Sequence, residues 1–230
     1  MPEPRKITEW CKPLTCCDEV WEAAYRRFET PAEERRKFRK RLENFGVTSW
    51  DRNLAVVELF CGTGNALNVW AEFGFEYLEG VDLSQRLLQQ YQGEAKLYIG
   101  DCRDLHLPDA SRDVIAVQGG VHHLPDLRGD LPRVFAEVAR VLRPDGRFLV
   151  VEPWRTPFLS LVHSGQNNRF LRACWPRYNA LATMTEREAT TYFRWLSESR
   201  YILAEFGRYF STEQQVIGWG KWQCVGRPRR

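Results

Sequence analysis

The sequence has 230 residues, enough for one well-buried α/β domain and short for two. Its 43% hydrophobic and 27% charged residues are typical of a globular protein and argue against disorder. No apolar run reaches about 18 residues and the first ten residues carry no apolar signal core. We therefore expect no membrane span and a cytoplasmic protein.

The cysteines and the charge distribution narrow the classes of bound ligand. The seven cysteines are scattered, with no C-x-x-C pair and no histidine at ligand spacing, which predicts reduced thiols and no zinc site. Residues 46–152 hold 10 basic and 16 acidic side chains, and residues 153–230 hold 12 and 5. An acidic centre suits a cationic ligand and a basic C-terminal part an anionic one, although solvated faces are the simpler interpretation.

Two helices are predicted before residue 50. Apolar side chains recur at helical spacing over residues 18–28. Thr30 then has the place of an N-cap, with proline next and Glu33 closing a capping box. Phe38 and Leu42 predict the buried face of the second helix.

From residue 54 short apolar strands alternate with helices. We predict strands at 54–60, 76–83, 95–100, 112–118 and 147–153, and helices at 65–73, through Leu87, Leu88 and Tyr91, and at 131–142. This alternation predicts a parallel sheet that is covered by helices on both faces.

The last third of the chain breaks this rhythm. Residues 154–208 are aromatic, basic and helical in pattern, with Thr185 and Glu188 at the ends of a second capping-box pattern. Residues 210–219 and 221–227 predict an antiparallel strand pair. We expect one domain over 1–230, made of an N-terminal helical cap (1–50), a ligand-binding core (54–153), a helical substrate lid (154–208) and a terminal strand pair (209–230).

The segment VVELFCGTGN predicts a strand that runs through a glycine turn into a helix. Gly62 and Gly64 let the backbone turn sharply and let a ligand approach it closely. A dinucleotide fingerprint requires a third glycine three residues later, where Leu67 stands, so pyrophosphate binding is disfavoured. Glu58, beside the turn, suits a cationic ligand better.

Two further acids end the next two strands. Asp82 follows the second strand and Asp101 the third. Open α/β sheets bind ligands at the carboxyl ends of their strands, and a carboxylate there can accept ribose hydroxyl protons. Either aspartate alone is as well explained by a cap or a turn. Together with Glu58 and the glycine turn they predict a binding edge.

These segments resemble a known family in order and spacing. ELFCGTGN, GVDLS, GDCRDLHLPD, RDVIAVQGGVHHLPD and ARVLRPDGRFLVVEP are similar to the successive motifs of class I S-adenosylmethionine-dependent methyltransferases, over residues 54–153. They are most similar to the small-molecule subgroup related to the ubiquinone and menaquinone methyltransferases. The resemblance implies a Rossmann-like seven-stranded sheet, mostly parallel with an antiparallel C-terminal strand, with S-adenosylmethionine as donor and S-adenosylhomocysteine as product.

The resemblance also implies cofactor-binding residues. Glu58 corresponds to the acid near the methionine amino group, and Gln118 to the residue at the methionine end of strand four. The others form the loop under the cofactor (Gly62, Thr63, Gly64), bind the ribose (Asp82) or lie beside the adenine (Leu83, Asp101, Cys102). Phe60 departs from the pattern, because relatives commonly have a glycine at this position.

Three residues at strand ends are candidate general bases. His122 and His123 follow strand four and Glu152 ends strand five, on the edge where the methyl group is expected. The alternative is that the His-His-Leu segment is a packing element at a helix start. No histidine–carboxylate cluster of ligand spacing is visible, so no metal is predicted.

The residues of the lid indicate what kind of methyl acceptor to expect. Its aromatic side chains form either an acceptor pocket or the lid's own core, and four arginines could hold an anion: Arg155, Arg169, Arg172 and Arg177. We expect a small-molecule acceptor, aromatic or anionic, with oxygen weakly favoured as the methylated atom. Nucleic acid is disfavoured, since QGGVHH replaces the signature of base amino-methylation. A non-catalytic S-adenosylmethionine-binding protein remains the other alternative.

Overall fold

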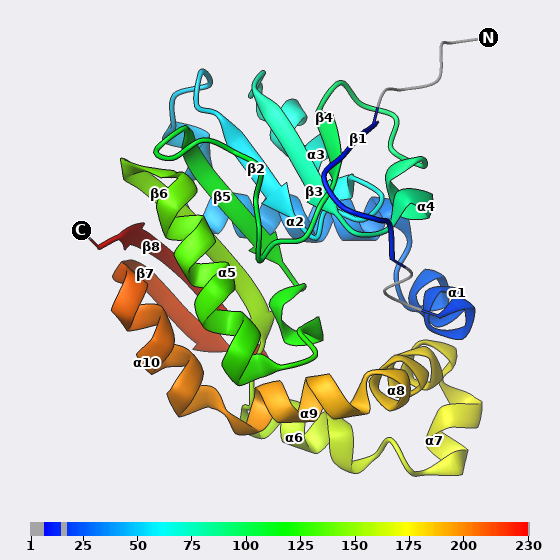
Figure 1. The fold of residues 1–230 in the computed structure, drawn as a ribbon. Coiled ribbons are helices and arrows are strands. Elements are labelled where there is room, and N and C mark those ends of the chain that lie inside the picture. The colour runs from blue at the N-terminus through cyan, green and yellow to red at the C-terminus, as the bar shows by residue number, and fades with distance from the viewer. Residues whose placement is uncertain (1–6, 15–17, 230) are drawn as a thin grey trace, which may run out of the picture.

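One sheet organises the protein. The computed structural model describes residues 7–14 and 18–229, and its strands lie in the order β1-β4-β3-β2-β5-β6-β8-β7 (Figure 1). Their bounds are β1 Ile7–Glu9, β2 Val56–Leu59, β3 Leu78–Asp82, β4 Lys96–Ile99, β5 Arg112–Gln118, β6 Leu142–Pro153, β7 Phe210–Gly218 and β8 Lys221–Pro228. Strands β1 to β6 are parallel, and β8 is antiparallel to both β6 and β7.

Helices cover both faces of this sheet and cross its carboxyl edge (Figure 1). Their bounds are α1 Glu19–Phe28, α2 Pro31–Asn44, α3 Asn65–Glu72, α4 Gln85–Leu88, α5 Leu127–Val141, α6 Pro157–Ser164, α7 Arg169–Cys174, α8 Pro176–Arg187, α9 Ala189–Ser197 and α10 Ser199–Tyr209, with 3-10 turns η1 at Val47–Ser49 and η2 at Val121–His123. The expected α/β Rossmann-like sheet, mostly parallel with helices on both faces, is confirmed.

Alternate strand residues supply two separate cores. Val56 packs with α2 and α3, in a cluster that includes Leu42 and Trp70. Val57 points to the opposite face and belongs to a second cluster with α5 and α10, which includes Phe135. Because side chains along a strand alternate between the faces, a strand buried on both sides must be apolar throughout, and β2 is fully buried.

The N-terminal segment adds a strand that was not predicted. Residues 1–50 were expected to be helical, but Ile7–Glu9 pairs in parallel with β4 as an eighth, edge strand. The Trp10 N–H donates to the Ile99 carbonyl at 2.8 Å, and the Trp10 ring stacks on Tyr98 at 4.2 Å. A three-residue strand is too short to show an alternating pattern in the sequence.

One capping prediction is confirmed and the other is wrong. Thr30 and Glu33 form the capping box that begins α2. Thr185 instead lies inside α8, where its hydroxyl donates to the Leu181 carbonyl at 3.0 Å. Glu188 lies between α8 and α9, and its side chain does not cap either helix. Threonine satisfies its hydroxyl equally well by bonding back along a helix, so the pattern alone does not locate a helix start.

Element boundaries differ modestly from those predicted. Helix α4 ends at Leu88 and does not reach Tyr91, whereas β6 begins at Leu142 because that residue still pairs with Arg112 beyond a register shift. The predicted C-terminal strand pair is present as β7 and β8. Of the cysteines, Cys16 and Cys17 lie outside the described residues, and the other five are free thiols.

Helices α6 to α9 cross the carboxyl edge of the sheet, and α1 meets α8 there (Figure 1). Ala24 of α1 packs with Ala180 and Met184 of α8 in a small third cluster. The lid aromatics divide between core and surface: Trp154 and Trp195 are buried, whereas Phe170 and Trp175 are exposed. No helix in the described parts of the chain combines the length and the apolarity needed to cross a membrane.

Candidate functional site

The glycine loop after β2 has the backbone that its sequence predicts. Phe60, Gly62 and Gly64 all have positive φ, at 55°, 53° and 76°. Gly64 begins α3, and a Cβ there would overlap the Tyr91 ring. The Phe60 ring packs against Gly120, where a Cβ on residue 120 would overlap it. The missing side chain of Gly120 therefore makes room for Phe60. The departure from the family pattern therefore has a local compensation.

Asp82 links this loop to the end of β3. Its carboxylate accepts the Gly62 N–H and the Ser84 N–H, each at 2.8 Å. Burial raises the pKa of Asp82, and these backbone N–H groups partly offset the rise. Each oxygen has a second lone pair for a ligand hydroxyl. The same side chain thus shapes the loop and offers an acceptor at the edge.

Glu58 is a buried carboxylate at the end of β2. It is 2% exposed, and it accepts the Trp70 indole N–H at 2.9 Å and the Gln118 amide at 3.3 Å. Burial raises the pKa of Glu58 to about 7, against the effect of these two donors and of Arg41. The ionised form of such a buried carboxyl is stabilised by a cation placed beside it.

A cavity of about 180 Å³ opens over this edge of the sheet. Glu58, Gly62, Thr63 and Gln118 line it, and Trp21 closes it from α1. The Oε1 atom of Gln118 is buried and has no hydrogen-bond partner in residues 7–14 and 18–229. The structure therefore brings four of the predicted cofactor-binding residues to one cavity, with an unused polar atom among them.

The predicted adenine-side residues lie away from that cavity lining. The single Nε–H of Arg103 is shared between the two oxygens of the Asp101 carboxylate, at 2.9 and 3.0 Å. Arg103 outweighs the effect of burial and lowers the pKa of Asp101. Cys102 is a buried thiol, and the Leu83 carbonyl accepts the Leu14 N–H at 3.0 Å.

Glu152 connects the end of β6 to the two histidines. It is 1% exposed; one oxygen accepts the Gly120 and Val121 N–H groups at 2.8 and 2.7 Å, and the other lies 2.6 Å from His122 Nδ1. Burial disfavours the imidazolium, but Glu152 and Glu188 outweigh it and raise the pKa of His122 to about 9. Burial and the neighbouring His122 lower the pKa of His123 to about 4.

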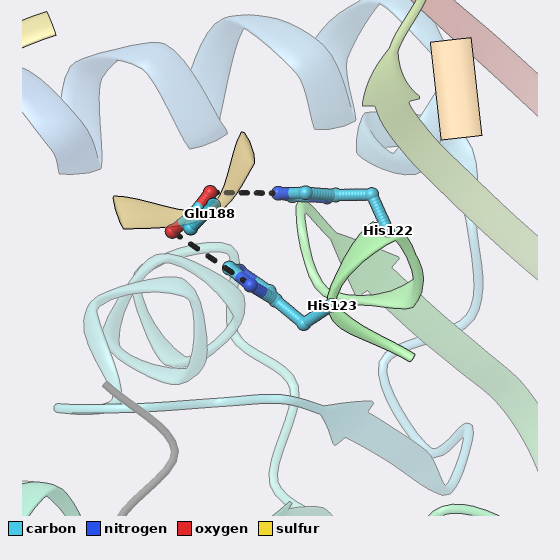
Figure 2. A group of neighbouring side chains, drawn as sticks. All are labelled: His122, His123 and Glu188. Atoms are coloured by element: carbon cyan, nitrogen blue, oxygen red, sulfur yellow. Dashed lines mark ion pairs between the residues drawn. The ribbon is translucent and has the colours of Figure 1, made fainter. Parts of the chain in front are cut away.

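Sequence reasoning missed three charged residues at this edge. Glu188 of the lid lies 3.7 Å from both histidines (Figure 2). Arg41 of α2 is a buried cation and Lys221 of β8 is a half-buried one, and neither has a described carboxylate within ion-pair distance. Burial, with Arg41 and Lys37 nearby, lowers the pKa of Lys221 to about 7. No local sequence pattern marks these residues, because their partners are distant in the chain.

The lid arginines are mostly engaged elsewhere. Arg172 pairs with Glu186, and Arg177 pairs with Glu33 of α2. Arg155 lines a second cavity, of about 370 Å³, together with His163 and Phe193. Arg169 is exposed at the start of α7.

Comparison with known proteins identifies the core. Residues 57–150 match a family described as methyltransferase domain. The chain is 32% identical over 129 residues to a demethylmenaquinone methyltransferase of Lactobacillus johnsonii, covering 51% of this chain and 49% of that protein. Residues 57–150 form a class I methyltransferase domain.

Further comparisons agree on the class and differ on the acceptor. An mRNA cap guanine-N(7) methyltransferase of Arabidopsis thaliana is 27% identical over 121 residues, 43% of this chain and 33% of that protein. A Pyrococcus horikoshii protein of known structure shares the fold, with a TM-score of 0.68 at 17% identity, covering 93% of this chain and all of that one. The chain spans less than half the length of these two curated relatives.

The residues around the cavity fit the donor that this methyltransferase domain implies. S-adenosylmethionine carries a sulfonium and an ammonium, and Glu58 presents a buried carboxylate to the cavity. Gln118 adds the unused Oε1 atom, which can accept an N–H. The glycine loop leaves backbone accessible beside them.

Proposed function

We propose that this chain transfers the methyl group of S-adenosylmethionine to an oxygen atom of a small anionic acceptor. The observation that carries the donor half is the buried Glu58 carboxylate, which lines a cavity at the carboxyl edge of the methyltransferase sheet. The acceptor half rests on two cations, the buried Arg41 and the half-buried Lys221. The Glu152 carboxylate acts electrostatically on both cations, and Lys221 pairs with Pro153 next to it, so both lie near the end of β6.

The proposed cofactor contacts follow the family pattern. Glu58 and Gln118 hold the methionine end, and Gly62, Thr63 and Gly64 form the loop beneath it. Asp82 binds the ribose hydroxyls, while Leu83, Asp101 and Cys102 flank the adenine. We propose that residues 1–230 act as one domain, with α1 and the lid closing over the site, because α1 packs against α8.

When bound, S-adenosylmethionine supplies an electrophilic methyl group on sulfur, and in-line positioning provides much of the acceleration. A hydroxyl acceptor must also lose a proton. Both oxygens of Glu152 and Nδ1 of His122 are already engaged. His123 contacts the Trp21 ring, which lines the cavity, so we assign proton uptake to the His123 side.

Calorimetric titration tests the donor half. S-adenosylhomocysteine is expected to bind and NADH not to bind. Because charge-assisted hydrogen bonds contribute about 1.5–3 kcal/mol each, Asp82→Ala should weaken S-adenosylhomocysteine binding roughly 10- to 150-fold. Asp104→Ala, at an exposed aspartate beyond β4, is the matched control and should change nothing. Asp82→Asn separates misfolding from lost contacts. A folded wild-type protein that does not bind S-adenosylhomocysteine refutes the assignment.

An acceptor screen with labelled S-adenosylmethionine tests the second half. Hydroxy acids and matched neutral alcohols are compared, and the hydroxy acids are expected to be methylated preferentially. Lys221→Met should raise KM for the anionic acceptor with little change in kcat. His123→Ala should lower kcat, since positioned proton transfer contributes about 10²- to 10⁴-fold. Equal use of neutral alcohols argues against the anion site, and full turnover by His123→Ala removes the base.

A further inference from the structure

His122, His123 and Glu188 form a compact group of metal-ligand side chains beside the cavity. One donor atom from each lies within 4.8 Å of the other two. The histidines come from η2, after β5, and Glu188 comes from the junction of α8 and α9 in the lid (Figure 2). Figure 2 shows the Glu188 carboxylate facing both rings, one oxygen toward each.

The distances in this group are wrong for hydrogen bonds and close to those of shared coordination. Glu188 Oε2 lies 3.7 Å from His122 Nε2, and Glu188 Oε1 lies 3.7 Å from His123 Nδ1. Hydrogen bonds between such groups are about 2.7–3.2 Å long. Ligands on a tetrahedral ion with bonds of about 2.0–2.1 Å are separated by roughly 3.3 Å. One donor atom from each residue lies within 4.8 Å of the other two, so coordination would require Glu188 and the two rings to close on the ion.

Two polar features support an ion between the three side chains. Glu188 Oε1 is buried and has no hydrogen-bond partner among the described residues. A buried carboxylate oxygen without a partner is costly, so such atoms normally indicate an unseen partner. His122 is also oriented from behind, because Glu152 Oε2 lies 2.6 Å from its Nδ1. A carboxylate on the second nitrogen is the usual support of a metal-binding histidine.

We propose that His122 Nε2, His123 Nδ1 and the Glu188 carboxylate bind one divalent first-row transition metal ion, with Zn²⁺ as the best match. Two imidazoles and one carboxylate are a ligand set that catalytic zinc sites use, with the fourth position left open. No sequence pattern marks this site, because Glu188 is 65 residues beyond His123 and belongs to the lid.

An ion at this position would have two effects on the protein. It would join the lid to the core, because its ligands come from η2 and from the α8–α9 junction. It would also lie beside the donor cavity, since the His123 ring meets Trp21 edge-on at 6.1 Å between centroids and Trp21 lines that cavity. This step rests on the proposed function: the acceptor oxygen would bind at the open fourth position of the ion. The ion would then lower the pKa of the bound hydroxyl, and with the metal bound His123 would hold the ion rather than take up the proton.

Titration of the untagged, chelator-treated protein with Co²⁺ tests the site without S-adenosylmethionine or an acceptor. One equivalent should produce visible ligand-field bands of a four-coordinate ion, and Zn²⁺ should abolish them. Zn²⁺ should also raise Tm, because an ion that binds only the folded state stabilises it.

Matched variants identify the ligands. Glu188→Gln should weaken Co²⁺ binding by roughly 100-fold or more, and Glu152→Gln by about 10- to 100-fold as the supporting group. Glu186→Gln, at the exposed glutamate two residues earlier, and His106→Ala, at an exposed histidine, should leave binding unchanged. Each variant is first shown to melt cooperatively and to bind S-adenosylhomocysteine as the wild type does.

Absent bands in the wild type, or bands that persist unchanged in Glu188→Gln, overturn the metal site. The group is then a buried triad in which His122 bridges Glu152 and Glu188. Because S-adenosylhomocysteine affinity is measured on the same samples, loss of the metal site leaves the proposed donor untouched. Conversely, Co²⁺ bands in a protein that does not bind S-adenosylhomocysteine would support the metal site and contradict only the proposed donor.

Discussion

Replacing Glu58 by glutamine is expected to stabilise the free protein and to weaken its binding of S-adenosylmethionine. The carboxylate is 2% exposed, and burial raises its pKa from 4.5 to about 7. Above pH 7 the folded protein therefore contains an ionised group in an unfavourable environment. At 1.36 kcal/mol per pKa unit the cost is about 3 kcal/mol, an upper limit for the gain at pH 8.

The amide can replace the carboxylate without leaving a polar group unpaired. The Trp70 indole N–H donates to one oxygen of Glu58, and Gln118 donates its amide to the other. A glutamine at position 58 keeps one acceptor for Trp70 and gains a donor. Gln118 can turn its amide so that its unpaired Oε1 accepts from that donor.

The raised pKa of Glu58 also predicts how the free energy of unfolding changes with pH. Because the folded pKa is raised, the folded state binds more protons than the unfolded state between about pH 4.5 and 7. The contribution of Glu58 therefore lowers stability by about 1.4 kcal/mol per pH unit across that interval and levels off above it. Chemical denaturation at several pH values should show this slope in the wild type and its loss in Glu58→Gln.

Cofactor binding should move in the opposite direction. Loss of one charge-assisted contact to the methionine ammonium should weaken S-adenosylhomocysteine binding roughly 10- to 150-fold at pH 8. In the wild type, affinity should fall as the pH drops below 7, where Glu58 becomes protonated. Glu72→Gln, at a 44% exposed glutamate on α3, is the control. A destabilised Glu58→Gln, or one with unchanged affinity, contradicts this account.

The parts of the site that could be predicted are those whose cause is local. The strand, the turn and the helix start around Gly62 and Gly64 follow from a few consecutive residues, and both glycines have the positive φ of a sharp turn. Asp82 lies at a strand end, and parallel strand ends must meet at one edge. The same reasoning placed Glu58, whereas Gln118 was implied only by the family resemblance; both line one cavity.

The parts that could not be predicted depend on how distant segments meet. Glu188 fits a capping pattern equally well, and only the packing of the lid places it against the histidines. Arg41 has the pattern of a solvated helix residue, although the packed structure buries it. The β1 strand is too short to show periodicity. In each case the sequence permits several local solutions, and long-range packing selects one of them.

Removing the Glu152 carboxylate is expected to cause the largest loss of stability. Glu152 is 1% exposed and bonds to the N–H groups of Gly120 and Val121 and to His122 Nδ1. Glu152→Ala leaves these three groups without their acceptor in the interior. Breaking a buried charge pair by removing one partner typically costs about 3–5 kcal/mol, so Glu152→Ala should lower the free energy of unfolding by about that amount.

Two variants separate this effect from a general intolerance of the fold. Glu152→Gln retains an oxygen that can accept both backbone N–H groups and should lose less than Glu152→Ala. Glu72→Ala, at the exposed glutamate of α3, should change stability by less than about 0.5 kcal/mol. Urea denaturation of the metal-free proteins gives all three values. If Glu152→Ala is as stable as Glu72→Ala, the bonds from β6 to η2 do not hold the edge together.

The location of Glu152 explains why this loss should reach the site as well. Its bonds fix Gly120 and Val121, directly after Gly119, which lines the donor cavity, and directly before His123. Without Glu152 the η2 turn has no anchor on β6, so the two histidines and the cavity wall should loosen together. Affinity for S-adenosylhomocysteine should therefore fall in Glu152→Ala, but less than in Glu58→Gln, because Glu152 acts on the cavity only through the backbone.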